Sequence, residues 1–318
     1  MKLGFIYAGQ GAQHVGMGQD FYEKFDEYKN VIDDASKSVK RVTGINLKSM
    51  SFEGPIEELS KTRNTQPAMV AFQVGVTNLL KEEGIEPEYV AGLSLGEYSA
   101  MYEAGVFDQK DVISTVSWRA RYMEEASAGM DVKMAAVLGM DREIVEECCE
   151  EITEQTGGEQ VVEAANYNCP GQIVISGNAK AVDAASALLK EAGAKRILPL
   201  NVSGPFHTSL MKPAGKKLRK RLEKVEFGQP TAKIVFNCMG REKASTDLYE
   251  AILEKQVQSS VYLEDSIKYM AEQGVDTIVE IGPGNTISKF VKKTAPEVTV
   301  FSIDTVEDFE EVVKELKA

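Results

Sequence analysis

A serine flanked by two glycines, in the run Gly92-Leu-Ser94-Leu-Gly96, lies between two segments of different pattern. The preceding YVAGL is a short apolar run that predicts a buried strand, and the following LGEYSAMYEAG predicts a helix. A strand that turns sharply into a helix needs small residues at the bend, because a side chain would crowd the backbone there. The pattern therefore favours an α/β fold in which Ser94 stands exposed at the end of a buried strand.

The rest of the first 130 residues repeats this alternation of short apolar runs and helical segments. KLGFIYAG predicts another buried strand, and PAMVAFQVGVTNLLKEEG predicts a long helix with Pro67 at its first position. Alternating strands and helices favour a parallel sheet covered by helices. We expect residues 1–130 to form the first part of a large α/β catalytic domain.

The pattern changes near residue 131. Residues 131–202 predict strand, helix, strand, strand, helix and strand, in the runs MAAVLGM, DREIVEECCEEI, VVEAANYN, QIVISG, NAKAVDAASALLKEAG and KRILPLNV. This order is typical of a ferredoxin-like unit. Within residues 203–318, DTIVEIG and VTVFSID predict strands that rejoin the first domain. The predicted fold class is α/β: a large α/β-hydrolase-like domain with a parallel sheet plus an inserted small ferredoxin-like (βαββαβ) domain.

Charge and composition disfavour several classes of protein. The 318 residues carry a formal net charge of −13, so most of the surface would repel a phosphate backbone, and we expect no nucleic-acid partner. No stretch approaches the roughly 18 apolar residues of a membrane span, and the N-terminal apolar run is too short for a signal peptide. We expect a cytoplasmic protein with no membrane partner. The four cysteines form no CxxC pair and are not spaced with the two histidines as zinc ligands would be, so we expect no metal site.

A serine hydroxyl needs a base to become a nucleophile, and this chain has two histidines. His14 follows the glycine-rich AGQGAQ among polar residues, which is typical of an exposed loop. His207 lies in NVSGPFHTSLMKP, where the small domain ends and the large one resumes, and domain seams often hold ligand sites. We expect Ser94 to be the nucleophile and His207 its base; the alternative is that Ser94 is only a small residue in a tight turn. No acidic residue stands out as a third member of a triad.

Two backbone N–H groups are candidates for an oxyanion hole. Gly9 and Gly11 leave the N–H of Gln10 unhindered after the first strand, and the N–H of Leu95 begins the helix after Ser94. In such a hole the loss of one donor costs about 3 kcal/mol of transition-state stabilisation. A simple strand-ending turn remains the alternative for AGQGAQ. A dinucleotide-binding loop is disfavoured, because it would need glycine at position 14.

One arginine falls on the apolar face of a predicted helix. In DVISTVSWRARYMEEA a single stripe contains Val112, Val116, Arg119 and Met123. An unpaired charge on such a face is costly, whereas a bidentate contact with a carboxylate is strong. Either an internal acidic residue or a substrate carboxylate would satisfy Arg119, and the pattern alone favours the internal pair.

Seven stretches in the same order and spacing resemble the malonyl-CoA:acyl-carrier-protein transacylases, within the acyltransferase family of fatty-acid and polyketide synthesis. They are AGQGAQ, NTQPA, GLSLGEYSA, WRARYM, NYNCPGQIVISG, AKRILPLNVSGPFHTSLMKPA and EIGPGNTISKFVKK, and they extend along essentially the whole chain. The resemblance implies a ping-pong transfer of malonyl from malonyl-CoA to the phosphopantetheine thiol of acyl carrier protein. A malonyl ester of Ser94 would be the intermediate, His207 would move the proton in both steps, and no cofactor would take part.

The resemblance also implies roles for other residues. The N–H groups of Gln10 and Leu95 would hold the oxyanion, Arg119 would bind the free carboxylate of malonyl, and an oxygen in the region of Gln256 would orient His207 in place of an acid. The implied substrate-binding residues are Arg119, Gln66, Met123, Asn166 and Phe206. An aromatic residue next to the base goes with malonyl in preference to methylmalonyl. Many relatives have histidine where this chain has Leu93, and we expect that difference to alter the pocket wall and not the chemistry.

The implied partner, acyl carrier protein, is acidic, so docking on this acidic chain needs local positive charge. The expected docking residues are Lys195, Arg196, Lys216 and Lys217, although a solvated helix face is the alternative. We expect a monomer. A free-standing polyketide acyltransferase and an acyl thioesterase with the same Ser-His dyad are alternative functions. A non-catalytic carrier-binding module is a third, which the presence of both Ser94 and His207 disfavours.

Overall fold

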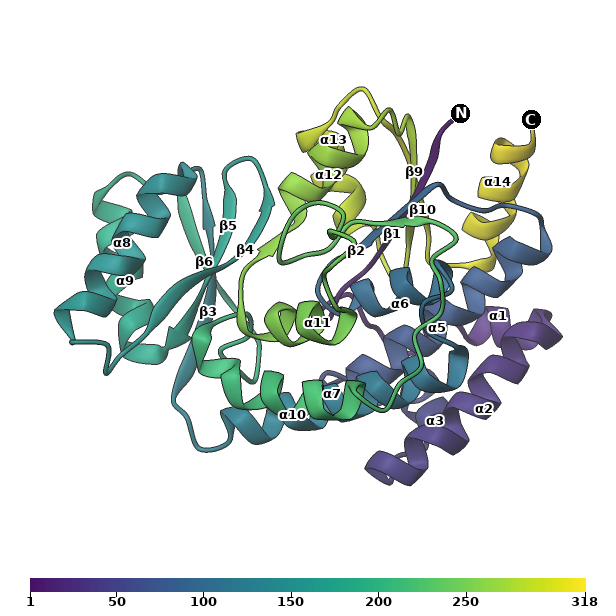
Figure 1. Cartoon of the computed structure of the whole chain (residues 1–318), viewed down its shortest axis with the longest axis horizontal. Coiled ribbons are helices and arrows are strands. Elements are labelled where there is room, and N and C mark those ends of the chain that lie inside the picture. The colour runs from purple at the N-terminus through teal and green to yellow at the C-terminus, as the bar shows by residue number, and fades with distance from the viewer.

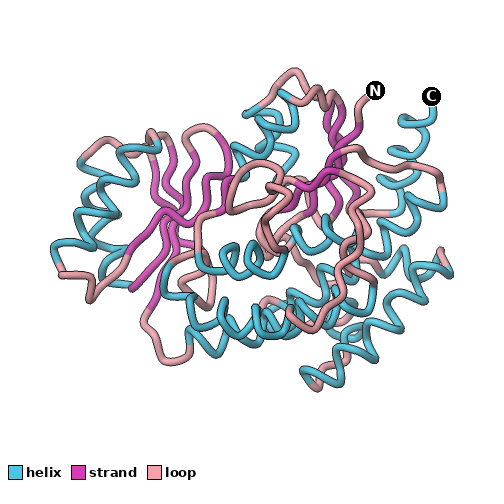
Figure 2. Tube along the Cα trace, in the orientation of Figure 1, coloured by secondary structure: helices cyan, strands magenta, loops and turns pink.

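Two sheets of five strands organise the chain, and Figure 2 shows them as two separate groups of strands. The computed structural model describes residues 1–318. The larger sheet has the order β10-β9-β1-β2-β7 and is entirely parallel. Its strands are β1 (Leu3–Tyr7), β2 (Tyr89–Gly92), β7 (Lys233–Ile234), β9 (Thr277–Ile281) and β10 (Thr299–Ile303). The smaller sheet contains β3 (Val132–Leu138), β4 (Val162–Cys169), β5 (Gln172–Asn178), β6 (Arg196–Leu200) and β8 (Val261–Tyr262).

Five helices in succession separate β1 from β2, and strands and helices alternate more regularly after residue 131. Before the small sheet they are α1 (Gln19–Lys24), α2 (Asp26–Thr43), α3 (Leu47–Phe52), α4 (Ile56–Leu59), α5 (Thr62–Glu82), α6 (Gly96–Glu103) and α7 (Gln109–Ser127). The small domain contributes α8 (Arg142–Gln155) and α9 (Ala179–Glu191). After it come the 3-10 turn η1 (Ser209–Met211), α10 (Lys212–Leu222), α11 (Tyr249–Gln258), α12 (Leu263–Glu272), α13 (Thr286–Thr294) and α14 (Val306–Lys317). None of these helices combines the length and the apolar composition needed to cross a bilayer.

Both faces of the parallel sheet are buried. Along β1, Phe5 and Tyr7 belong to a core that includes side chains of α2, α5 and α6, whereas Ile6 belongs to a second core with α12 and α13. Figure 1 shows α12 and α13 on one side of the sheet and α5 and α6 on the other. A strand that is buried on both faces needs a continuous apolar run, and this explains the uninterrupted pattern of the N-terminal strand.

The small sheet is antiparallel in the order β6-β3-β5-β4, which is the order of a ferredoxin-like unit. Helices α8 and α9 cover one face, and the other face contributes Met134, Ala136 and Val174 to the core of the large domain. The predicted fold class is confirmed by the parallel sheet and the second, small sheet. Strand β8 comes from the second part of the large domain and pairs in parallel with β4, so the two domains share a sheet. The boundaries at 130/131 and 202/203 stay a prediction.

The helix that contains Pro67 begins earlier than predicted. Helix α5 begins at Thr62, so Pro67 lies in its second turn and not at its first position. Asn64 donates a side-chain hydrogen bond to the carbonyl of Glu58 at 2.7 Å, and Thr65 donates one to the carbonyl of Leu59. These contacts with the preceding turn hold the start of the helix and outweigh the hydrogen bond that proline removes.

Candidate active site

Ser94 lies at the sharp turn between β2 and α6. Its φ of 54° is in the left-handed region, which residues other than glycine rarely occupy. The flanking glycines make the turn possible. A Cβ added at Gly92 would lie 2.1 Å from the carbonyl carbon of Gly96, and one added at Gly96 would lie 2.1 Å from the carbonyl oxygen of Tyr7. The structure thus places Ser94 on the strand-turn-helix unit that the spacing predicts.

A buried amide, Asn237, holds both arms of this turn. Its Nδ2 donates to the carbonyl oxygen of Gly92 and its Oδ1 accepts from the N–H of Ser94, both at 2.6 Å. Its own N–H donates to Glu97 at 2.5 Å, and burial raises the pKa of that fully buried carboxyl to about 8. Sequence reasoning missed Asn237, because no pattern marks it. It becomes a neighbour of Ser94 only because β7 pairs with β2.

His207 and Ser94 are in hydrogen-bond contact. The distance from His207 Nε2 to Ser94 Oγ is 2.6 Å, and His207 Nδ1 lies 2.9 Å from the backbone oxygen of Gln256. Because a carbonyl oxygen can only accept, Nδ1 carries the proton, and Nε2 is left to accept the proton of the serine hydroxyl. His207 also has a positive φ, 60°, and these two are the only non-glycine residues that do. Backbone strain of this kind clusters at functional sites.

The environment keeps the imidazole of His207 neutral. Burial, and then the nearby guanidinium of Arg119, lower the pKa of His207 to about 4. The ring is therefore in its proton-accepting form at neutral pH. The other histidine, His14, is half-exposed, bonds to Asp304 at 3.1 Å and does not line the cavity around Ser94.

Arg119 on α7 is fully buried and has no carboxylate partner. One of its terminal nitrogens lies 3.2 Å from Ser94 Oγ and 3.2 Å from Gln256 Oε1, its guanidinium packs on the ring of Tyr98, and its Nε has no hydrogen-bond partner. Burial lowers the pKa of Arg119. The internal ion pair that the helical pattern favoured is absent, because no acidic side chain comes within ion-pair distance of the guanidinium. A buried charge in this state is suited to an anionic ligand.

Gln256 on α11 connects the nucleophile, the base and the cation. Its backbone oxygen accepts from His207, its Nε2 donates to the backbone oxygen of Ser94 at 2.6 Å, and its Oε1 accepts from Arg119. It is fully buried. One residue therefore fixes the relative positions of three others that come from separate parts of the chain.

These side chains border a cavity of about 160 Å³ between the two domains. The large domain supplies Gly9, Gln10, Gln66, Leu93, Ser94, Arg119, Met123, Phe206 and His207 to its lining. The open face of the small sheet supplies Met134, Asn166, Asn168 and Val174, and Leu200 and Val202 complete the wall. All five residues expected to bind substrate are thus brought to one place. Asn168 and Met134 are lining residues that sequence reasoning did not name.

The two predicted oxyanion donors are the N–H groups of Gln10, in the loop after β1, and of Leu95, the residue after Ser94. Neither the N–H of Gln10 nor that of Leu95 has an acceptor within the protein. Leu95 immediately precedes α6, so its free N–H lies at the N-terminus of that helix. A Cβ at Gly9 would lie 2.6 Å from the backbone oxygen of Leu93, so glycine allows the first loop to pack against the Ser94 turn.

The four predicted docking residues lie outside the cavity and are exposed. Lys195 and Arg196 are at the start of β6, the edge strand whose last residue, Leu200, lines the cavity. Lys216 and Lys217 are on α10, which follows His207 in the chain. Lys217 pairs with Glu125 at 2.8 Å.

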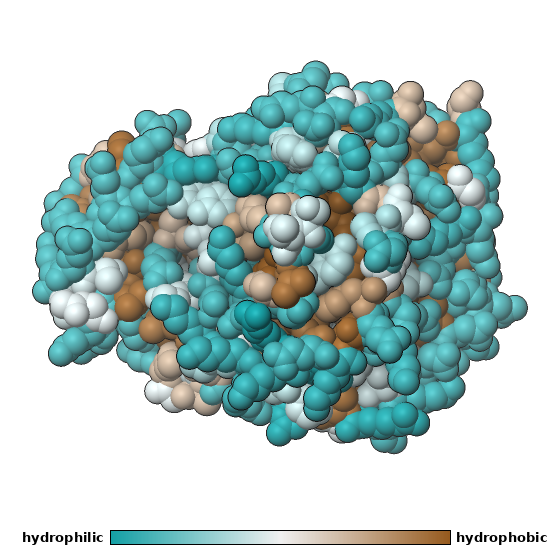
Figure 3. All heavy atoms as spheres, viewed as in Figure 1, coloured by the Kyte–Doolittle hydropathy of each residue, from teal (hydrophilic) through white to brown (hydrophobic).

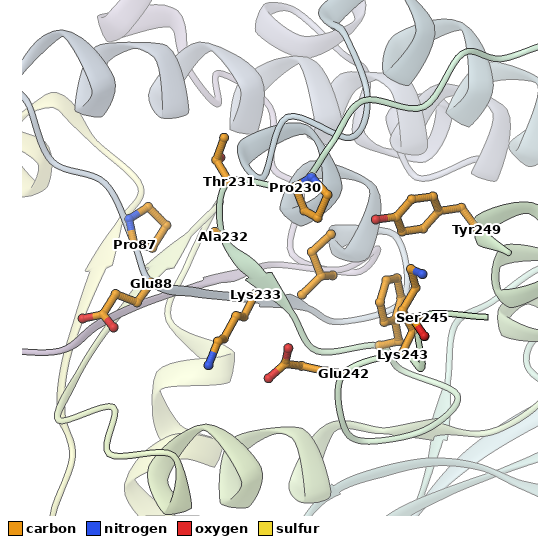
Figure 4. Close-up of a pocket in the computed structure, with 12 residues that line it drawn as sticks. Pro87, Glu88, Pro230, Thr231, Ala232, Lys233, Glu242, Lys243, Ser245 and Tyr249 are labelled. Atoms are coloured by element: carbon orange, nitrogen blue, oxygen red, sulfur yellow. The ribbon is translucent and has the colours of Figure 1, made fainter. Parts of the chain in front are cut away.

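A larger recess, of about 570 Å³, lies at the edge strand β7 and lacks this chemistry. Figure 4 shows Glu88, Lys233 and Glu242 on one side of it and Lys243, Ser245 and Tyr249 on the other. It has a serine but no histidine to act as its base. We therefore assign the active site to the smaller cavity, which unites a nucleophile, a base and a buried cation. No group of three or more His, Cys, Asp or Glu side chains has the arrangement of a metal site.

Comparisons with known proteins agree with one another. Residues 4–312 match the family model described as an acyl transferase domain. The chain is 41% identical over 319 residues to the malonyl CoA-acyl carrier protein transacylase of Bacillus subtilis (strain 168), covering 99% of this chain and 98% of the relative. The crystal structure of the enzyme of that name from Clostridium perfringens has a TM-score of 0.92 at 38% identity, covering 100% of this chain and 98% of the other. A malonyl-transacylase in complex with a type II PKS acyl-carrier protein has a TM-score of 0.91 at 34% identity, covering 99% and 100%.

Proposed function

This chain belongs to the acyl transferase family, and from that premise we propose that it transfers malonyl from malonyl-CoA to the phosphopantetheine thiol of acyl carrier protein in fatty-acid biosynthesis. One observation carries the proposal: the 2.6 Å contact of Ser94 and His207 lies beside a buried arginine with no carboxylate partner. The dyad supplies a nucleophile for a thioester. The buried arginine favours an acyl group with a free carboxylate, because that carboxylate can pair with the guanidinium.

In the first half-reaction an ester forms on Ser94. His207 Nε2 takes the hydroxyl proton as Oγ attacks the thioester carbonyl, and the negative charge develops on the carbonyl oxygen. The N–H groups of Gln10 and Leu95 bind that oxygen. The C–S bond then breaks, the sulfur of coenzyme A takes the proton from His207, and coenzyme A leaves as the free thiol.

In the second half-reaction the acceptor thiol takes the place of coenzyme A. His207, now neutral again, accepts the proton of the phosphopantetheine thiol, whose sulfur attacks the ester carbonyl. The C–O bond to Ser94 breaks, and the proton returns to Oγ through His207. The scheme uses a thioester substrate and the chain's own side chains, and it requires no cofactor.

Arg119 selects for the malonyl group. A guanidinium binds a carboxylate through two parallel hydrogen bonds. The free carboxylate of malonyl would therefore be the ion-pair partner that Arg119 lacks in the folded chain. The 3.2 Å contact of Arg119 with Ser94 Oγ places the carboxylate site next to the reacting carbonyl.

Phe206 forms the wall beside the base, where a branched methyl group would collide. Discrimination against one extra methyl group is worth about 1–3 kcal/mol. Gln66, Met123 and Asn166 line the same cavity.

Intact-protein mass spectrometry after mixing with malonyl-CoA tests the assignment directly. We expect a malonyl adduct on the parent chain and none on Ser94→Ala. Arg119→Ala should lose the preference for malonyl over acetyl, because it retains the dyad but not the cation. An adduct of equal yield on Ser94→Ala would contradict the proposal.

We further propose that acyl carrier protein docks on Lys195, Arg196, Lys216 and Lys217. Two observations support this: similar chains bear the name acyl carrier protein transacylase, and these exposed cations lie on the two elements that lead to the cavity. The double variant Lys195→Glu/Arg196→Glu should slow transfer to the carrier much more than acylation by malonyl-CoA. Lys180→Glu/Lys190→Glu on α9 is the matched control. Equal slowing of both half-reactions would remove the docking assignment.

A free-standing polyketide acyltransferase is a second candidate, because one similar structure is a malonyl-transacylase with a type II PKS acyl-carrier protein. The chemistry is the same, so the two candidates differ only in the carrier. Transfer rates to a fatty-acid carrier and to a polyketide carrier, measured side by side, distinguish them. A thioesterase is tested by the lifetime of the acyl-enzyme in buffer without a thiol. The monomeric state and the cytoplasmic location stay predictions, and sedimentation tests the first.

A further inference from the structure

A second recess lies on the outer surface between α7 and α10, which pack side by side (Figure 1). Its volume is about 430 Å³. It is lined by Trp118, Arg121, Tyr122, Glu125, Lys217, Lys220, Arg221 and Lys224. Five of these residues are cationic and one is a carboxylate, so the recess has a formal charge of +4 in a chain whose net charge is −13.

Most of this positive charge has no internal partner. Glu125 accepts from Arg121 Nε and from Lys217 Nζ, both at 2.8 Å, and hydrogen bonds from Lys217 and Arg121 lower the pKa of this carboxyl. Arg221 donates only to the hydroxyl of Ser114, at 2.7 Å. Lys220 and Lys224 form no salt bridge. Three cations therefore face the recess without a counter-charge from the protein.

The two arginines are held in place by an aromatic ring. The guanidinium carbons of Arg121 and Arg221 lie 5.2 Å and 5.1 Å from the centre of the Trp118 ring. Arg221 is partly buried, which lowers the pKa of its guanidinium, and its Nε is buried without a hydrogen-bond partner. A guanidinium that is fixed on an indole and partly desolvated is preorganised for bidentate contact with an oxyanion.

The recess is separate from the catalytic cavity. No residue lines both, and α7 directs Arg119 to the cavity while it presents Trp118, Arg121 and Tyr122 to the recess. On α10 the cations recur at three- and four-residue spacing and so share one side of the helix and its C-terminal extension. Figure 3 shows a hydrophilic surface over α10. Neighbouring like charges at this spacing destabilise a helix, and a bound anion would remove that repulsion.

We propose that this recess binds a small polyvalent anion that contains a diphosphate group. Its volume is in the range of small-molecule sites, and a hollow with converging cations suits a compact anion. Arg121 and Arg221 bind phosphoryl oxygens in pairs, and Lys220 and Lys224 neutralise the remaining charge. The site is separate from the catalytic cavity, and it shares Lys217 with the docking surface proposed above.

Isothermal titration of the full chain with inorganic pyrophosphate, at physiological ionic strength, tests the site. We expect saturable binding of one pyrophosphate per chain. Lys220→Gln/Lys224→Gln should weaken it at least about tenfold, because two neutralising charges are lost. Arg221→Lys keeps the charge but loses the bidentate fork, and it should weaken binding several-fold. The matched control is Lys180→Gln/Lys190→Gln, which removes the same charge from α9 and should bind like the parent.

Two further measurements complete the test. ADP in competition with pyrophosphate identifies the source of the diphosphate: equal affinity indicates a free diphosphate, and tighter binding of ADP indicates a nucleotide. Acylation by malonyl-CoA should be unchanged in Lys220→Gln/Lys224→Gln, which shows that this variant is folded. The proposal is overturned by the absence of saturable binding, by an equal loss in the α9 control, or by variants that bind like the parent but transfer slowly to carrier protein. The last result would assign the recess to protein docking.

Discussion

The turns that carry Ser94 and His207 share an unusual backbone conformation but reach it by different means. Both residues have positive φ, 54° and 60°. The Ser94 turn joins a strand and a helix that are adjacent in the chain, and glycines at both sides make room for it. The segment after His207 is held by distant residues: His207 bonds to Gln256, and Ser209 donates its N–H to Glu163 at 2.9 Å. Glycine sterics make the first turn possible and Asn237 holds it, whereas the second turn depends on contacts with distant residues alone.

Because the two turns are held differently, substitutions near Ser94 and near His207 should have different effects. Changes in the Ser94 turn should act on folding, because no rearrangement nearby can relieve a clash with backbone atoms. Changes around His207 should act on the geometry and protonation of the ring while the fold persists.

Gly96→Ala should have the largest effect. The new Cβ would lie 2.1 Å from the carbonyl oxygen of Tyr7 in the central strand, and we expect the free energy of unfolding to fall by more than about 4 kcal/mol. Denaturant unfolding measures it. Gly129→Ala is the control: it has φ 76° and open space around the new Cβ, so only about 1–2 kcal/mol of left-handed strain is expected. Equal losses in the two variants would contradict the requirement for glycine at the contact between Gly96 and Tyr7.

Asn237→Ala should lower both stability and the rate of acylation. It leaves the N–H of Ser94 and the carbonyl of Gly92 buried without partners, at about 1–3 kcal/mol each, and it releases the turn that aims the serine hydroxyl. We expect kcat for acylation to fall by at least about tenfold with little change in KM. Asn78→Ala, which removes another partly buried amide with two side-chain hydrogen bonds, should lower stability alone. A normal kcat in Asn237→Ala would show that Asn237 only stabilises the fold.

The pH dependence should report the buried state of His207. Because the pKa of this imidazole is lowered to about 4, the rate of acylation should stay level from pH 8 to about 5 and fall below that range. A midpoint near 6.5 would instead indicate a solvated imidazole.

The free energy of unfolding should also depend on pH through His207. Between pH 6.5 and 4 the histidine is protonated in the unfolded chain but stays neutral in the folded chain. The free energy of unfolding therefore decreases as the pH falls through this window, by about 3 kcal/mol in total. Unfolding of the parent and of His207→Gln at several pH values isolates this contribution. Identical pH slopes for the two chains would contradict it.

Glu163→Gln should have the smallest effect of the series. Glu163 on β4 accepts from both the N–H and the hydroxyl of Ser209, and so it anchors the segment after His207 to the small domain. Loss of the charge should weaken these bonds by about 1 kcal/mol and slow acylation a few-fold. Glu154→Gln on α8 is the control. A slowing as large as that of Asn237→Ala would mean that the His207 turn depends on one contact.

Much of the site was predictable because its residues lie in local patterns. The family membership inferred from seven stretches is confirmed, and so is the fold class. The structure also brings Ser94, His207, Arg119 and Gln256 together. The helical pattern of α7 placed Arg119 on a buried face, but it suggested an internal ion pair that the structure lacks. The spacing of apolar residues shows which face of a helix is buried, but it does not show which side chains of other elements pack against that face.

The amino-acid pattern was enough to predict the strand-turn-helix at Ser94, the parallel and ferredoxin-like units, and the concentration of cations on α10. These depend on periodicity, glycine sterics and spacing within a few residues. Other features were visible only in the folded chain. Asn237 bonds to the Ser94 turn, and β8 pairs with the small sheet. Helix α5 begins before Pro67, and two arginines pack on Trp118 beside a recess. The reason is physical: each of these depends on atoms brought into contact by packing, and contacts between elements leave no periodic signal in the chain.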